Sequence, residues 1–142
     1  MRAHHVRVTR TFSAPPQRVF DYLAEHENLE ALFGAKITRL ADGADSARNG
    51  VGSVRRLQIG PLPPFEETVT EFVPPERIVY RITAGSPLRG HVGVMQFSPH
   101  GEGTRLDYDI RLASPVPFLA LLVQVALTRN ILSGLNAVER AA

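Results

Sequence analysis

The sequence predicts an α+β domain in which a curved antiparallel sheet of about six to seven strands wraps around one long C-terminal helix. Three observations lead to this prediction. Segments with the two-residue alternation of strands follow one another after residue 34, with turn residues between them. The only long segment with helically spaced apolar residues lies at the C-terminal end. Strands joined by hairpins need one face covered, and that helix is the only element long enough to cover it.

The first part of the chain predicts one strand and two short helices. Alternating residues over Val6 to Ser13 indicate a half-buried strand. Ser13 is a good N-cap and the prolines after it suit a first helical turn, so a helix is expected to begin there. Asn28 is expected to cap a second short helix that Gly34 ends.

The remaining chain predicts six further strands and the long helix. The expected strands cover residues 35–40, 51–59, 65–73, 77–83, 88–97 and 104–112. Pro74-Pro75-Glu76 and the segment 99–103 indicate hairpin connections. Ser114-Pro115-Val116-Pro117 opens the final helix, whose apolar residues recur at steps of three and four: Phe118, Leu121, Leu122, Val125, Leu132, Leu135 and Val138.

Composition limits the classes of protein that this chain can be. Its 142 residues suit one domain, residues 1–142, with a sizeable core. The absence of cysteine excludes disulfides, thiolate catalysis and zinc–cysteine sites, and a net charge of +2 does not indicate a nucleic-acid partner. No targeting segment is visible, and the most apolar stretch, Phe118 to Leu127, is shorter than the ~20 residues of a membrane span. A cytoplasmic protein without an integral membrane segment is expected.

Four local motifs in this order resemble one known family. They are Phe12-Ser13-Ala14-Pro15 followed by Val19-Phe20 and Leu23, then Asn49-Gly50-Val51-Gly52-Ser53, then Glu71-Phe72-Val73-Pro74-Pro75-Glu76-Arg77-Ile78, and finally Gly103-Thr104-Arg105-Leu106-Asp107-Tyr108. Over nearly its whole length the chain resembles the helix-grip fold of the START-like (SRPBCC) superfamily, also called the polyketide cyclase/dehydrase and lipid-transport family. The family often has a tryptophan near Leu32 and Phe33, and this chain has none.

The resemblance implies a cavity between the sheet and the long helix. It implies an apolar or partly polar ligand, such as a lipid, sterol or polyketide, and neither a metal nor a bound cofactor. The first functional hypothesis is therefore a carrier or sensor of a small hydrophobic molecule. The alternative is a cofactor-free enzyme of the cyclase, aromatase or dehydratase type, and a second alternative is a protein-interaction module. The oligomeric state stays open between a monomer and a homodimer.

The inward faces of the expected strands supply the candidate binding residues. His91 shares a face with Gly93, Met95 and Phe97, and is either a histidine bonded within the core or a group that orients a ligand. Tyr80 and Tyr108 alternate with apolar neighbours and are expected to point inward, as core residues or as phenols presented to a ligand.

An arginine–glutamate pair is also expected inside the sheet. Arg55 and Arg56 are consecutive, so one points in and one out. Arg56 is expected inward if it shares the face of Val54, with Glu67 or Glu71 as its partner. Such a pair is either structural or an anchor for an acidic or keto group.

Apolar residues complete the candidate ligand wall. Met95 is an adaptable wall residue. Four helix residues are expected to serve both core and cavity: Leu121, Leu122, Val125 and Leu132.

No catalytic residue can be assigned from spacing alone, and His91, Tyr108 and Arg56 are the candidates. The enzyme hypothesis requires that these side chains converge in one cavity. The interaction hypothesis requires a large exposed apolar patch on the sheet edge or on the long helix. The five histidines are not spaced to converge, so no metal site is expected.

Overall fold

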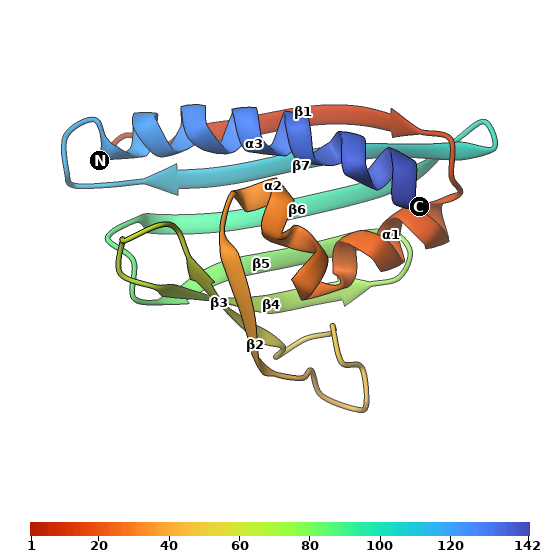
Figure 1. Ribbon diagram of the computed structural model, residues 1–142, viewed down its shortest axis with the longest axis horizontal. Helices are drawn as coiled ribbons and strands as arrows, with labels where there is room; N and C mark the ends of the chain where they lie inside the picture. Colours follow the sequence, from red (N-terminus) through yellow and green to blue (C-terminus); the bar gives the residue numbers. More distant parts are fainter.

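A computed structural model describes residues 1–142 and contains seven strands, two α-helices of one to three turns, a 3-10 turn and a long C-terminal helix (Figure 1). In chain order the elements are β1 (His4–Phe12), α1 (Pro16–Ala24), η1 (His26–Leu29), α2 (Glu30–Phe33), β2 (Lys36–Ala41), β3 (Val54–Gln58), β4 (Phe65–Val73), β5 (Arg77–Ala84), β6 (Arg89–His100), β7 (Gly103–Ala113) and α3 (Leu119–Ala141). This order and architecture confirm the predicted fold class.

All seven strands belong to one antiparallel sheet in the order β1-β7-β6-β5-β4-β3-β2. The first two strands in the sequence therefore lie at opposite edges, and the segment from α1 to α2 crosses from one edge to the other. Alternation along the strands sorts the side chains, as in β7, whose buried face carries Thr104, Leu106, Tyr108, Ile110 and Leu112.

The short helices differ from the prediction at their starts and agree at their end. Pro15 is the N-cap of α1 and provides no side-chain cap, whereas the Ser13 hydroxyl hydrogen-bonds to Glu139 of α3. Asn28 lies inside η1, and its amide donates to the carbonyl of Tyr22 at 2.9 Å. Gly34 ends α2 in the left-handed conformation at φ 62°, as predicted, because glycine adopts that conformation without steric cost.

The C-terminal part of α3 packs tightly on the rest of the domain. Ile131, Leu135 and Val138 are fully buried. A Cβ atom on Gly134 would lie 2.9 Å from the Cα atom of Leu32, so α2 and α3 approach each other at a distance that only glycine permits.

The N-terminal part of α3 is exposed on its outer side. Leu121, Leu122 and Val125 keep about half of their surface in solvent, with exposed fractions of 44%, 66% and 51%. By length and composition α3 as a whole could cross a membrane. The expectation of no membrane span used only Phe118 to Leu127, and the helix continues to Ala141. The helix packs against β1 and α2 and contributes Ile131, Leu135 and Val138 to the core, and one helix of this length and composition is weak evidence for a membrane span.

Candidate functional site

A cavity of about 550 Å³ lies between the sheet and the N-terminal part of α3. Fourteen of its 21 lining residues are hydrophobic. The lining comes from strands β3 to β7, from α2 and α3, and from the loops beside them. Leu62, Pro63, Pro87 and Leu122 line it and are also exposed, so the mouth lies between the β3–β4 loop, the β5–β6 loop and α3. Cavities of this volume and apolar lining are typical of sites for small molecules.

The inner wall of the cavity carries a buried carboxylate held by an arginine. Glu67 of β4 lines the cavity, and its Oε1 accepts a hydrogen bond at 2.8 Å from Nε of Arg55 on β3. Nη2 of Arg55 lies 2.8 Å from the same oxygen but is not aligned as a hydrogen bond, so this buried nitrogen has no acceptor of its own. Both side chains are at most 5% exposed, so the arginine and the carboxylate form a buried ion pair.

His91 of β6 stands beside that carboxylate with a defined hydrogen position. The backbone N–H of Ile82 donates to Nδ1 of His91 at 3.1 Å, so the proton of the neutral ring is on Nε2. Nε2 faces Oε2 of Glu67 at 3.6 Å, which is longer than a hydrogen bond. Burial lowers the pKa of His91 below its ordinary value, so the ring is neutral near pH 7.

Two tyrosines extend this polar wall into the core. The hydroxyls of Tyr80 and Tyr108 are hydrogen-bonded to each other, and only Tyr80 has its side chain at the cavity. The Arg55 guanidinium lies over the Tyr80 ring, with Cζ of Arg55 4.6 Å from the ring centroid. Burial raises the pKa of both phenols well above the usual value, so both are neutral donors and acceptors.

The position of the Tyr80 ring depends on a glycine across the sheet. Gly93 pairs with Tyr80 in the β5–β6 register. A Cβ atom at residue 93 would lie 2.1 Å from Cζ of Tyr80, so the ring occupies the space above that backbone. The absence of a side chain on Gly93 thus leaves room for the Tyr80 ring, which contacts both Arg55 and His91.

The prediction that Arg56 points inward is wrong, because Arg55 is the inward arginine. Arg55 shares a face with Leu57, which is 1% exposed, whereas Arg56 is exposed beside Glu66 at 3.9 Å. The alternation of β3 follows the buried residue Leu57 and not the half-exposed Val54 on the opposite face. Of the two expected partner carboxylates, Glu67 forms the buried pair, with Arg55, whereas Glu71 accepts from Arg77.

The other expected site residues are distributed between the cavity, the core and the surface. His91, Glu67, Tyr80 and Leu122 line the cavity, and Tyr108 lies one hydrogen bond behind Tyr80. Met95 is 1% exposed and belongs to the packed core. Leu121, Val125 and Leu132 point to solvent and do not line the cavity. Of the three catalytic candidates, His91 and Tyr108 lie in this region and Arg56 does not.

Sequence reasoning did not single out two polar residues of this region. Asn130 of α3 lines the cavity, and its position one turn after Leu127 on the inward side of the helix could have indicated this. Ser86 lines the mouth, in a loop whose path the sequence does not specify.

A buried histidine outside the cavity was also not anticipated. Nε2 of His26 lies 3.0 Å from Oγ of Ser53, and that hydroxyl donates to the Gly50 carbonyl at 2.7 Å. Nε2 of His26 therefore carries the proton, and Nδ1 is buried without a hydrogen-bond partner. Burial, with the nearby Arg55 charge, lowers the pKa of His26 to about 3. No cavity reaches this pair, so it is a structural contact.

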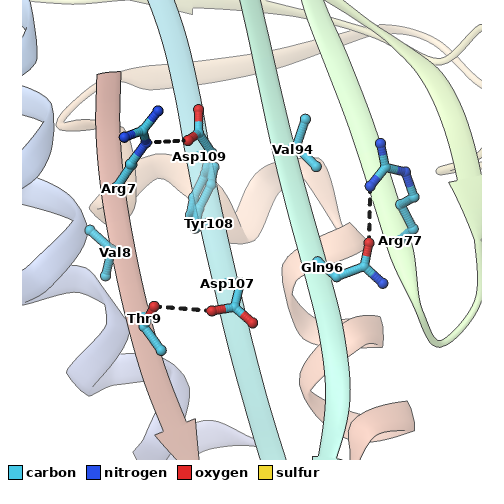
Figure 2. A pocket seen from close by; sticks show the side chains of 9 residues that line it. All are labelled: Arg7, Val8, Thr9, Arg77, Val94, Gln96, Asp107, Tyr108 and Asp109. Carbon is cyan, nitrogen blue, oxygen red and sulfur yellow. Dashed lines mark hydrogen bonds and ion pairs between the residues drawn. The ribbon is translucent and has the colours of Figure 1, made fainter. Parts of the chain in front are cut away.

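A second hollow, of about 360 Å³, lies on the outer face of the sheet across β1, β7, β6 and β5 (Figure 2). Its polar side chains are already paired with one another. Arg7 donates to Asp109 at 2.9 Å, Thr9 to Asp107 at 3.0 Å and Arg77 to Gln96 at 2.9 Å. With only three hydrophobic residues in its lining and its charges neutralised, it is a weaker candidate than the apolar cavity.

Large apolar side chains are exposed along α3 and the turn before it. They are Val116, Phe118, Leu121, Leu122, Val125 and Leu132. Exposed apolar side chains of this kind are part of what the interaction hypothesis requires on the long helix. No group of three or more His, Cys, Asp or Glu side chains is arranged to hold a metal ion.

Comparison with known proteins identifies the fold and a family. A model of the family described as "Polyketide cyclase / dehydrase and lipid transport" matches residues 3–142. No curated protein matches the sequence. Among solved structures, a protein of Thermus thermophilus is 24% identical over 97% of this chain and 96% of its own, with a TM-score of 0.76.

Two further solved structures have the same fold. The Zhui aromatase/cyclase of a Streptomyces species is 22% identical over 98% of this chain and 93% of its own, with a TM-score of 0.72. A protein of Rhizobium loti is 26% identical over 96% and 97% of the two chains, with a TM-score of 0.65.

Proposed function

Because the chain belongs to the polyketide cyclase/dehydrase and lipid-transport family, we propose that it binds a small, largely apolar molecule in the cavity between the sheet and α3, as a carrier or sensor. The cavity of about 550 Å³ with a predominantly hydrophobic lining is the observation that carries this proposal. A molecule that enters removes its own apolar surface and that of Leu57, Phe65 and Val123 from water, which favours binding by about 25 cal/mol per Å². A single domain over residues 1–142, located in the cytoplasm, is part of the same proposal.

A cavity-blocking variant tests this role. Val123 of α3 is half-buried and lines the cavity, so Val123→Trp places an indole in the ligand space. In a fluorescence titration with an environment-sensitive apolar dye, we expect this variant to bind at least about tenfold more weakly than the original protein. Ser133→Trp adds the same indole at an exposed position of the same helix and is the matched control. If the dye binds Val123→Trp as well as the control, the cavity is not the binding site.

A second candidate function is a cofactor-free cyclase or dehydratase. Its support is that the Glu67 carboxylate and the His91 imidazole both face the cavity, 3.6 Å apart, beside the Tyr80 phenol. A carboxylate and a neutral imidazole can move a proton to or from a bound carbonyl compound. Cyclised product from a short poly-β-ketone chain, formed by the original protein and lost in His91→Phe, would favour the enzyme over the carrier. Binding without turnover would favour the carrier.

A further inference from the structure

The polar wall of the cavity presents one hydrogen-bond donor and one acceptor side by side. Oε1 of Glu67 is occupied by Arg55, and Nδ1 of His91 is occupied by the N–H of Ile82. Oε2 of Glu67 and Nε2–H of His91 remain, and they face each other at 3.6 Å without a hydrogen bond. Both side chains are only 5% exposed and line the cavity, so a molecule in the cavity is the partner within reach.

We propose that this pair recognises a hydroxyl group on an otherwise apolar ligand, with the hydroxyl donating to Oε2 of Glu67 and accepting from Nε2 of His91. The inference rests on the proposed binding function and names the chemical class of the ligand. A hydroxyl is at once a donor and an acceptor through one oxygen, and 3.6 Å is a separation over which one oxygen can bond to both groups.

Other polar groups fit this pair less well. A ketone or ether oxygen accepts from His91 but places its second lone pair against the Glu67 carboxylate. A ligand carboxylate meets the same negative charge, and Arg55 is already bonded to Glu67 and does not line the cavity. An ammonium group suits Glu67 but meets the N–H of His91, whose ring is fixed as a donor there by Ile82. A buried polar group left without a partner costs about 1–3 kcal/mol, so these differences affect affinity.

The walls around the pair define the rest of the ligand. Leu57, Ile82 and Ile110 lie on the sheet side, and Val123 and Leu127 on the helix side. These walls offer dispersion contacts and no hydrogen bonds from their side chains. The expected ligand is therefore an amphipathic alcohol or phenol, with an apolar body in the cavity and its hydroxyl at the inner wall.

Three probes that differ in one substituent test the proposal. Hydroxypyrene, methoxypyrene and methylpyrene, substituted at the same carbon, have nearly the same apolar body. We expect the original protein to bind hydroxypyrene about tenfold more tightly than the other two, in fluorescence titrations at a pH where the probe hydroxyl is protonated. Equal affinities for the three probes would overturn hydroxyl recognition and leave the binding function intact. Failure of all three probes to bind would count against both.

Two variants locate the recognition. His91→Phe removes the donor, and the tenfold preference for hydroxypyrene should fall below about threefold, while methylpyrene still binds. Asn130→Ala is the control: it removes the polar side chain that α3 contributes to the cavity, and the tenfold preference for hydroxypyrene should persist. Circular dichroism establishes that each variant is folded, and the probe series on the original protein stands independently of them. Loss of the preference in Asn130→Ala but not in His91→Phe would overturn the assignment to Glu67 and His91.

Discussion

The two halves of α3 both carry large apolar side chains and have different tasks. Residues 131–141 contribute Ile131, Leu135 and Val138 to the packed core. Residues 119–130 contribute Leu119, Leu122 and Val123 to the wall of a cavity and expose Leu121 and Val125 to solvent. The difference teaches that one helix can hold the domain together at one end and cover a binding site loosely at the other. The α3 variants below test that division.

The largest effect is expected in the packed half. Leu135→Ala removes a fully buried side chain and leaves a space that close-packed neighbours cannot fill, so the free energy of unfolding should fall by about 2–5 kcal/mol. Urea denaturation measures this change. A loss below about 1 kcal/mol would contradict the view that this half is the packed one.

Acid should weaken the domain through the histidine that lies outside the cavity. The folded pKa of His26, about 3, is below the unfolded value of 6.5, so unfolding takes up a proton between these values and stability falls as the pH falls. Between pH 6.5 and 5 the free energy of unfolding should decrease by about 1–2 kcal/mol from His26 alone. His91, whose pKa is also lowered, changes stability in the same direction.

Urea denaturation at the two pH values checks this effect. His26→Gln retains a donor toward Ser53 and cannot titrate, so it should reduce the dependence on pH. An unchanged dependence in that variant would assign the acid sensitivity to other groups.

The close approach of α2 and α3 predicts a smaller loss. Gly134→Ala would gain about 1 kcal/mol in helix propensity if its surroundings were open. Because the new methyl group would meet the Leu32 backbone at 2.9 Å, we expect a net loss of about 1 kcal/mol. The neighbouring exposed residue provides the control, since Ser133→Ala should change stability by less than about 0.5 kcal/mol. A Gly134→Ala variant more stable than the original would show that the two helices separate easily.

The smallest effect on stability is expected in the cavity half. Val125→Gln replaces an apolar side chain that is about half exposed and outside the cavity lining, so the free energy of unfolding should change by about 0.5 kcal/mol or less. Sedimentation velocity on the same variant shows whether this exposed side chain mediates association. A loss as large as that of Leu135→Ala would abolish the distinction between the halves.

The sequence predicts the fold well because strand alternation and turn residues are local signals. The hairpin at Pro74-Pro75-Glu76, the αL stop at Gly34 and the inward faces of β6 and β7 are examples. The inward arginine was predicted wrongly. Arg55 and Arg56 point to opposite faces of β3, and the choice between them depends on whether Val54 or Leu57 is taken as the buried neighbour. Apolar spacing along α3 likewise predicts an inward stripe but does not distinguish wall, core and exposed positions, since that depends on where the sheet curves away from the helix.

Similar reasoning applies to the polar wall of the candidate site. His91 and Tyr80 could be placed on inward faces by alternation alone. The separation of Glu67 and His91, and the unoccupied donor and acceptor that result, depend on the register between β4, β5 and β6. That register includes two irregularities in the β4–β5 pairing, which no local signal predicts.

One hydrogen bond joins the start of α3 to the edge strand β1, where another chain could pair and start aggregation. β1 is a terminal strand of the sheet, and α3 lies along it, with Nε2 of Gln124 donating to the His5 carbonyl at 2.6 Å (Figure 1). Any movement that lifts the first turns of α3 to admit a ligand would break this bond and bare a strand that another chain can pair with. Arg10 on that strand donates to the neutral Asn136 and forms no ion pair, so its charge disfavours the pairing of a second copy along this edge.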